Sequence, residues 1–517
     1  MKKLKIDKYT FFSALAILLM VCIPLILFPE QGEAIINKAF KFITHNLGFM
    51  YIWEGLAALV FAIWISFSKY GKIVLGDPNE KPEFKTFSWA GMLFCAGIGA
   101  SILYWGTIEW AYYFTAPPFG LEKGTWLAAE WAATYGIFHW GPTGWILYSL
   151  PALPIGYSYF VKKKPVLKIS EVCRGVLGDR VDGVLGKIID VLFMFGLLGG
   201  AGTTLGLGTP MIAAGIHKVT GISQSVGLNL LILIIVTVIF SFSAYSGLKK
   251  GIKVLSDINI VLMLIILAII FITGPTLFII KMGTTSIGIL IQNFVRMDTW
   301  MDPVLNTGFS ENWTVFYWAW WTIYAPFMGL FIAKISRGRT IRNVIGGSVL
   351  FGTMGCALVF VILGNLGMSL QLTNALPVIE MLSENGAPET IISIISTLPL
   401  GNVVVILFTI VAIIFLATTF DSASYTLAAV TTEKISGDQD PARWNRLFWA
   451  FSLSLLPASL LIIDGPLSTL QTASIIGGLP ITPIIVIMMV SFVKVLRKDE
   501  IEGKIKITSS ENNRSCA

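Results

Sequence analysis

A succession of long apolar runs constrains this chain more than any other feature. A helix needs about 20 mostly apolar residues to cross the hydrocarbon core of a membrane. The 517 residues, 55% hydrophobic and only 13% charged, contain twelve runs of roughly that length. A soluble fold of this composition would lack polar surface, so we predict an all-α membrane protein with twelve transmembrane helices. The runs are residues 12–29, 50–68, 88–114, 136–161, 187–214, 228–245, 257–280, 313–334, 343–367, 403–427, 445–463 and 474–494.

The loops between these runs differ in charge, and the difference predicts an orientation. Lysine and arginine gather in every second loop, and these residues favour the cytoplasmic side of a membrane. Both termini of this multi-pass protein are therefore predicted in the cytoplasm. The same clusters account for the formal net charge of +7 and form no single basic face for nucleic acid. The clusters hold Lys69, Lys72, Lys85, Lys162, Lys163, Lys164, Lys168, Lys249, Lys250, Lys253, Lys334, Arg337, Arg339, Arg342, Arg443 and Arg446.

Other segments are predicted not to cross. Ile287–Val295 and Glu389–Leu398 are short and amphipathic, so we expect them along the outer surface. The residues after Val495 are polar and predicted to be disordered. The first run ends at Pro29 and Glu30 without a small-residue cleavage site, which predicts a retained helix rather than a signal peptide. The five cysteines have no metal-binding spacing.

Two runs contain residues that interrupt a helix. The third has Gly97 and Gly99, and the eighth has Pro326 and Gly329. A break inside a membrane survives only where it lines a cavity or is covered by protein. Close helix packing explains the glycines alone equally well, but breaks at matching positions of two halves predict an inverted repeat with a mid-membrane site. The predicted organisation is 1–87 (tail and two extra spans), 88–280 (first repeat), 281–312 (outer connector with an amphipathic helix), 313–494 (second repeat) and 495–517 (cytoplasmic tail).

Aromatic residues gather beside these predicted breaks. Trp145 and Tyr148 are three residues apart, and Trp320 and Tyr324 are four apart, so each pair shares a helix face. A quaternary ammonium has no hydrogen to donate, and aromatic faces in a desolvated cage recognise it instead. Packing between helices would explain one such pair. Two clusters beside a break favour the cage.

The residues around the first break also bear on the charge of the substrate. Gly97, Gly99 and Ser101 offer backbone N–H groups and a hydroxyl, and the nearest carboxylate, Glu109, lies two turns away. A bare cation such as choline would favour a buried carboxylate partner. A zwitterion can place its ammonium in the cage and its carboxylate against N–H groups or Ser101. We therefore predict a betaine-type zwitterion.

Over nearly its whole length the chain resembles the betaine/choline/carnitine transporter family. The most specific segments are Tyr104-Trp-Gly-Thr-Ile-Glu109, Phe138-His-Trp-Gly-Pro, Trp313-Thr-Val-Phe-Tyr-Trp-Ala-Trp-Trp and Ala333-Lys-Ile-Ser-Arg-Gly-Arg-Thr340. The resemblance implies a LeuT-like fold with a five-plus-five inverted repeat, a homotrimer in membrane lipid, and import or exchange of trimethylammonium compounds. It implies a substrate site of Trp140, Trp145, Tyr148, Trp320, Trp321, Tyr324, Tyr112, Gly97, Gly99, Ser101 and Met328.

The family pattern also bears on coupling. Sodium-driven members resemble this chain at Thr418 and Thr419, whose hydroxyls suit a hard cation, and Asn259 stands where sodium-independent exchangers have an arginine. Met328 matches the exchangers instead, unless it is a soft core filler. The resemblance thus implies sodium as coupling ion ahead of carnitine/γ-butyrobetaine exchange, and no other cofactor. The implied sodium sites comprise Thr418, Thr419, Gly97, Ala96, Asn259 and Phe327.

Glycine betaine is the first expected substrate and carnitine the second. Ser101 replaces the third glycine of the Gly-x-Gly-x-Gly of sodium-coupled betaine carriers, and this departure leaves the size and identity of the substrate open. Neither an enzyme nor a channel is favoured, since the sequence lacks HExxH, a phosphate loop and a ring-forming filter. Short terminal segments predict uptake without strong osmotic gating. Of the ionisable residues inside spans, Glu54, Glu109 and Asp421 are functional candidates. Structural pairing is expected for Asp190, Asp257 and His139.

Overall fold

The computed structural model describes residues 5–164, 166–246, 252–435, 440–463, 472 and 475–505. Those residues form an all-helical protein with two isolated β-bridges, Ile6 to Thr432 and Val74 to Thr340. Lys249, Lys250 and the last residues of the predicted tail lie outside the described residues. The all-α prediction is confirmed.

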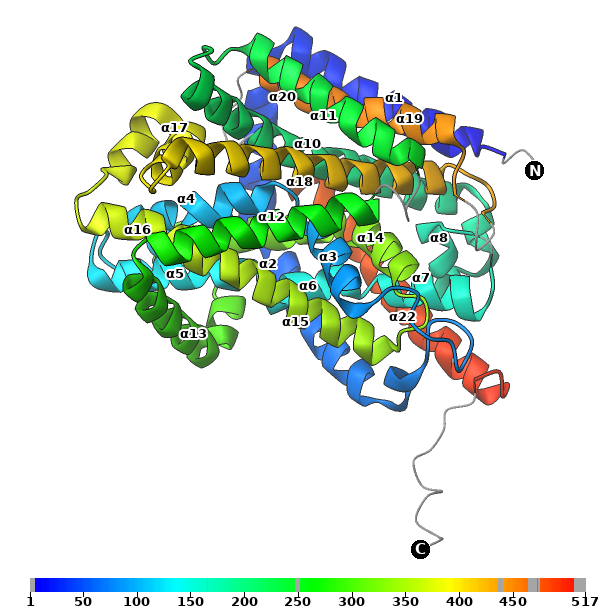
Figure 1. Cartoon of the computed structure of the whole chain (residues 1–517). Coiled ribbons are helices and arrows are strands. Elements are labelled where there is room, and N and C mark those ends of the chain that lie inside the picture. Colours follow the sequence, from blue (N-terminus) through cyan, green and yellow to red (C-terminus); the bar gives the residue numbers. More distant parts are fainter. Residues whose placement is uncertain are drawn as a thin grey trace, which may run out of the picture.

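Helices occupy each of the seven predicted spans in the first part of the chain. α10 and α18, far apart in the sequence, pack side by side along the molecule (Figure 1). The first seven spans are α1 (Lys8–Leu27), α2 (Pro29–Phe67), α3 with α4 (Thr86–Ile98, Ser101–Thr115), α5 with α6, α7 and η3 (Trp126–His139, Pro142–Ser149, Ala152–Gly156, Tyr157–Val161), α10 (Val184–Thr220), α11 (Val226–Ser246) and α12 (Ile252–Thr273).

The second part supplies the other five spans. They are η5 with α14 (Ser310–Thr314, Val315–Ile335), α15 with η6 and α16 (Ile341–Val359, Phe360–Gly364, Asn365–Leu372), α18 (Gly401–Val430), α19 with α20 (Arg443–Leu453, Leu455–Ile463) and α22 (Ile481–Ile501). The connecting elements are η1 (Lys69–Lys72), η2 (Pro118–Gly120), α8 (Ile169–Val172), α9 (Arg174–Leu177), η4 (Gly178–Asp182), α13 (Thr276–Thr299) and α17 (Val378–Ser396).

Nine helices in the described residues are long and apolar enough to cross a membrane. Eight of them are predicted spans, and the ninth is α13. The other four predicted spans are shorter or divided: α1, the pair α3 and α4, the series α5 to η3, and the pair α19 and α20. A count based on the length of continuous helices therefore misses predicted spans that are short or divided into several helices.

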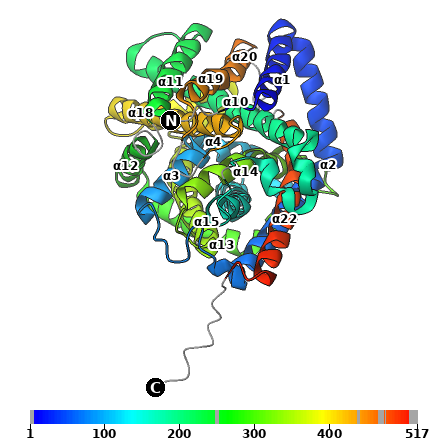
Figure 2. The same cartoon turned by 90° about the vertical axis from the view of Figure 1, so that its right-hand side faces the viewer.

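The eighth span differs from its prediction. Pro326 lies inside α14, which remains helical from Val315 to Ile335. A proline removes one hydrogen bond, but membrane helices tolerate it where neighbouring helices cover the freed group. α14 is enclosed in this way, since every residue from Val315 to Ala333 is buried, and it lies near the centre of the molecule in Figure 2. The break expected at Pro326 is therefore wrong: α14 stays helical there, and the breaks lie in the third and fourth spans.

The segments predicted not to cross are also longer than expected. The seventh span ends at Thr273, and α13 then runs to Thr299, far beyond the expected Ile287–Val295. Likewise, α17 begins at Val378 and contains a kink at Gly386. α22 continues to Ile501, six residues into the segment predicted to be disordered. These boundaries shifted because amphipathic helix continues past the end of an apolar run.

Candidate functional site

The break in the third span begins at Gly99, between α3 and α4. Its φ of +59° lies in the region that favours glycine. A Cβ at Gly99 would come within 2.6 Å of the Thr419 hydroxyl on α18, so the backbone also needs glycine for close approach. α4 then starts at Ser101 in the middle of the protein. The first N–H groups of a helix have no partner within the helix, so this end can accept an anionic group.

A second break places three aromatic residues opposite α14. α5 ends at His139, Trp140 adopts a non-helical conformation, and Pro142 begins α6 as its first residue. Proline suits that position because its φ is already helical. Trp145 and Tyr148 follow on α6, and their rings are 5.9 Å apart. Gly141 and Pro142 thus interrupt the helix and turn Trp140 and α6 toward α14.

Rings from the second break and α14 meet in one buried cluster. Trp321 is the hub, with centroid distances of 4.3 Å to Tyr148, 5.9 Å to Trp145 and 6.0 Å to Trp140. Trp140 also lies 5.8 Å from Trp320, at nearly a right angle. Such separations and tilted geometries are typical of favourable aromatic pairs. Trp140, Trp320 and Trp321 line one chamber, Trp145 packs against Trp321, and the four rings do not point apart into lipid.

Glycines make room for two of these rings. A Cβ at Gly144 would lie 2.3 Å from the indole of Trp321. At Gly352, on α15, it would lie 2.1 Å from Trp145. Neither indole fits beside a larger residue, so small residues in the neighbouring helices fix where the rings stand.

The rings enclose a cavity with two chemically different ends. Tyr148 stands between them, 4.3 Å from Trp321 and 6.5 Å from Tyr324. The aromatic end is lined by Trp140, Tyr317, Trp320 and Trp321. The polar end is lined by Gly97, Ile98, Ser101, Thr204, Tyr324 and Thr419.

Hydroxyls at the polar end form a short chain. Ser101 donates to the Thr204 oxygen over 3.4 Å, and Thr204 and Tyr324 share a hydrogen bond of 3.0 Å. The Tyr148 hydroxyl donates to the carbonyl of Gly97 over 3.3 Å. No carboxylate lines the cavity. Donors at one end and ring faces at the other suit a molecule with a carboxylate and a methylated ammonium.

The cavity is closed in this conformation. Its volume is about 20 Å³, which is enough for one water molecule. A trimethylammonium group needs more space, so the rings must separate before a substrate enters.

Hydrogen bonds behind the rings hold two indoles in place. The Trp140 indole donates to Glu109 over 3.1 Å, and the Trp321 indole donates to the His139 carbonyl over 3.0 Å. Glu109 also accepts from Tyr113 at 2.5 Å and from Tyr317. With these donors Glu109 is fully engaged with the protein, and it lies outside the cavity lining.

Four residues implied for the substrate site lie outside the cavity lining: Gly99, which forms the break itself, Trp145, Met328 and Tyr112. Trp145 and Met328 stand just behind the lining, where the Met328 methyl and the Trp145 ring are 3.0 Å and 3.4 Å from a Cβ built at Gly97. Tyr112 differs more. It is half-buried outside the lining, 5.6 Å from Trp313 and 6.2 Å from Trp105. Tyr112 sits on α4 well beyond the break, because eleven helical residues carry it away from Ser101.

Four lining residues were not expected at the substrate position: Ile98, Thr204, Tyr317 and Thr419. Tyr317 is part of the aromatic run before Trp320, so the sequence marked it as an aromatic residue near the site. Thr204 lies on α10 within a glycine-rich stretch. Nothing in the sequence tells which face of α10 meets the break, and that orientation depends on packing.

The residues implied for sodium binding are partly brought together. The Thr419 hydroxyl lies 3.3 Å from the carbonyl of Cys95 on α3, and both Thr418 and Thr419 bond the Phe415 carbonyl at 3.0 Å. The side chain of Asn259 is fully buried beside the Cys95 thiol. Phe327 is buried, 5.9 Å from the ring of Tyr324, and Gly97 lines the cavity. Ala96 lies in α3, and its side chain is outside the described residues.

These oxygens are the kind that a hard cation prefers. The described residues contain no group of three or more His, Cys, Asp or Glu side chains that would hold a metal ion. The donor set near α3 and α18 fits a monovalent cation better than a transition metal.

The remaining ionisable residues inside spans have protein partners. Glu54 accepts from Thr322 and Thr482 at 3.1 and 2.7 Å, and Asp421 pairs with Arg446 at 3.5 Å. Asp190 accepts from the backbone and hydroxyl of Ser170, and Asp257 pairs with Lys253 at 2.6 Å. His139 is bonded to Tyr113 and Thr314. These contacts agree with the structural roles expected of Asp190, Asp257 and His139.

The chain is similar to several known proteins. Residues 9–501 match the model of the BCCT, or betaine/carnitine/choline, transporter family. The chain is 32% identical over 497 residues to a protein named carnitine transporter from Acinetobacter baumannii, covering 96% of this chain and 90% of that protein. Among solved structures, a Na⁺-coupled sialic acid symporter in a substrate-bound outward-open state matches with a TM-score of 0.45 and 13% identity, over 88% of this chain and 87% of that one.

Proposed function

Because the chain belongs to the betaine/carnitine/choline family of membrane transporters, we propose that it is a secondary transporter that carries a trimethylammonium zwitterion by alternating access. One observation carries the proposal: a buried cavity has tryptophan and tyrosine rings at one end, hydroxyls at the other, and no carboxylate in its lining.

The aromatic end is the proposed ammonium site. Trp140, Trp320, Trp321 and Tyr148 present ring faces to a space from which water is largely excluded, where a cation–π contact contributes about 2 kcal/mol. Because Glu109 is occupied by Tyr113, Tyr317 and Trp140, it offers no free counter-charge. A net-neutral substrate fits this cavity better than a bare cation such as choline.

The polar end is the proposed carboxylate site. Ser101 stands at the start of α4, where free N–H groups and the helix dipole favour an anion. Thr204 and Tyr324 add hydroxyl donors. Carnitine is the first proposed substrate, because a relative of similar length is named a carnitine transporter. Glycine betaine is the second.

Sodium symport is the proposed coupling. It is supported by the Thr419 hydroxyl and the Cys95 carbonyl, 3.3 Å apart at the break, and by the uncharged Asn259 buried beside Cys95. Sodium-independent exchange is the alternative. It is favoured by Met328, whose methyl group packs at Gly97 against the substrate cavity.

The proposal includes a homotrimer in the cell membrane with both termini in the cytoplasm.

Uptake into proteoliposomes tests the function. Labelled carnitine, glycine betaine and choline are presented with an inward sodium gradient, with a matched potassium gradient, and with unlabelled substrate preloaded. The proposal expects uptake of carnitine or glycine betaine above choline, driven by sodium. Uptake that ignores sodium but accelerates with preloaded substrate would establish exchange, and no uptake of any trimethylammonium compound would refute the function.

A further inference from the structure

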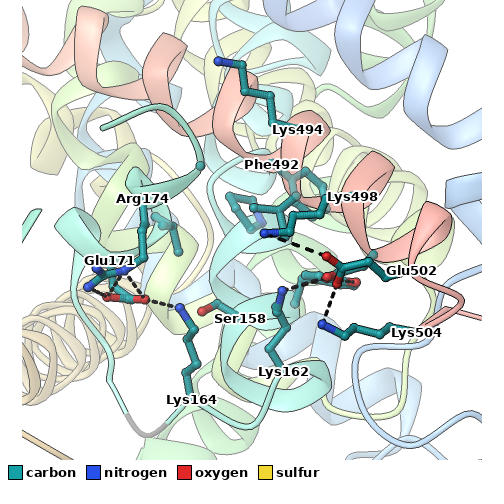
Figure 3. A pocket seen from close by; sticks show the side chains of 16 residues that line it. Ser158, Lys162, Lys164, Glu171, Arg174, Phe492, Lys494, Lys498, Glu502 and Lys504 are labelled. Atoms are coloured by element: carbon teal, nitrogen blue, oxygen red, sulfur yellow. Dashed lines mark hydrogen bonds and ion pairs between the residues drawn. The ribbon is translucent and has the colours of Figure 1, made fainter. Parts of the chain in front are cut away.

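A second cavity lies at the end of the helix bundle where α22 finishes, away from the aromatic chamber. It has a volume of about 380 Å³. One wall is formed by η3, α8 and α9, and the other by α22 (Figure 3). Nothing in the transport mechanism above uses this cavity.

Its lining is strongly cationic. Six cationic and three carboxylate residues line it, and Arg174 is also paired with Asp182 at 2.6 Å, just outside the lining, so the excess positive charge belongs to the lysines. The cations are Lys162, Lys164, Arg174, Lys494, Lys498 and Lys504, and the carboxylates are Glu171, Asp499 and Glu502. A cavity of this charge attracts anions.

Two of the carboxylates are occupied in holding the walls. Asp499, almost fully buried, accepts from Tyr157 at 2.8 Å and from Lys162 at 2.9 Å, which ties α22 to η3. Glu171 pairs with Arg174 at 2.7 Å and Lys164 at 2.5 Å. Burial raises the pKa of Glu171, but these two cations hold the pKa below its usual value. Glu171 therefore stays ionised, and its negative charge is balanced by Arg174 and Lys164 within the same wall.

The α22 wall retains excess positive charge. Lys498 and Lys504 share the single carboxylate of Glu502, at 3.8 and 2.5 Å. Lys494 is exposed one turn earlier and forms no ion pair within the described ranges. Lys494 and Lys498, four residues apart, stand on the same helix face.

Apolar residues complete the cavity. Pro154, Val172, Phe492 and Val495 lie among the charged side chains. A free phosphate ion would leave this surface in contact with water, whereas the glycerol and first methylenes of a phospholipid would cover it. Basic pockets between membrane helices bind lipid head groups in this way.

We propose that this cavity binds the phosphodiester head group of an anionic phospholipid, with Lys494 and Lys498 contacting the phosphate. The lipid would brace α22 against η3 and α8 at the membrane surface.

Native mass spectrometry of the full chain, released from vesicles of phosphatidylcholine and phosphatidylglycerol, tests the proposal. The double variant Lys494→Gln, Lys498→Gln should retain several-fold less phosphatidylglycerol than the wild type. The matched control, Lys123→Gln, Lys218→Gln, removes two exposed lysines away from this cavity, one in the loop before α5 and one in the last turn of α10, and should retain as much as the wild type.

Equal retention by both double variants would overturn the proposal. A competition arm with glycerol phosphate separates the two sources of phosphate. Displacement of the lipid only at large excess is expected, whereas displacement at equal concentration would assign the cavity to a soluble anion and contradict the lipid. Elution from size exclusion as a single peak checks that the variants are folded, and transport is read separately.

Discussion

At the scale of single residues, the indole of Trp321 is the contact on which substrate recognition most depends. It touches Trp140, Trp145 and Tyr148, and it is held by a hydrogen bond to the His139 carbonyl. The position of the Trp321 ring could be predicted only in part. Residue type and helical spacing pointed to an aromatic cage, whereas the depth of each ring depends on Gly144 and Gly352, which lie on other helices.

Replacing Trp321 tests its role directly. Trp321→Ala should weaken substrate binding by about 1–2 kcal/mol, the range of a desolvated cation–π contact, as measured by titration in detergent. Tyr112→Ala is the matched control, because Tyr112 lies outside the cavity, and its affinity should equal that of the wild type. Unchanged affinity in Trp321→Ala would remove that ring from the site.

Removing the Thr419 hydroxyl should change the sodium dependence of uptake separately from substrate binding. Thr419→Val keeps the shape and removes an oxygen that lies 3.3 Å from the Cys95 carbonyl. The sodium concentration for half-maximal uptake should rise about tenfold, the equivalent of 1.4 kcal/mol. Thr409→Val, which removes a hydroxyl bonded only to the Val405 carbonyl on the same helix, should leave sodium dependence intact. The same shift in both variants would contradict the assignment.

At the scale of elements, one broken helix organises the site. Gly97 and Gly99 made the break possible but did not decide it, because glycine in a membrane span either packs closely or interrupts the helix. The matching break at Pro326 was not found, since a covered proline can remain in a helix. Thr204 could not be placed from sequence, because the rotation of α10 about its axis is decided by contacts with α14 and α18.

Gly99→Ala tests the break itself. The substitution places a Cβ on a backbone with a φ of +59° and a ψ of -158°, a conformation used almost only by glycine, at a cost of roughly 1–3 kcal/mol. It also brings the new Cβ within 2.6 Å of Thr419. Transport should fall by at least about tenfold while the protein still elutes as a folded species. Gly346→Ala, at a helical glycine with open space around it, should transport normally. Normal transport by Gly99→Ala would show that the break does not need glycine.

At the scale of the whole molecule, the closed cavity links binding to conformational change. A volume of about 20 Å³ holds no substrate, so the chain must populate a state in which α6 and α14 separate at the rings. A ligand that binds the folded chain but not the unfolded chain stabilises the fold. The stabilisation is about 2.7 kcal/mol when the free ligand concentration is a hundred times the dissociation constant.

If the chain is a sodium symporter, the binding of sodium and the binding of substrate should be thermodynamically linked. Substrate should raise the melting temperature more in sodium than in potassium, because coupled ligands increase each other's affinity by the same factor. Thermal unfolding in detergent, followed by fluorescence, measures this. Equal shifts in sodium and potassium would argue against symport and leave exchange.

The central claim is that a trimethylammonium charge, and not merely its shape, is recognised by aromatic faces. The most direct measurement compares the affinity for carnitine with that for its tert-butyl analogue, in which carbon replaces the charged nitrogen. A cation–π cage predicts weaker binding of the analogue by about 2 kcal/mol, or roughly thirtyfold. Equal affinity for the two compounds would contradict the account, since a merely apolar pocket would hold both alike.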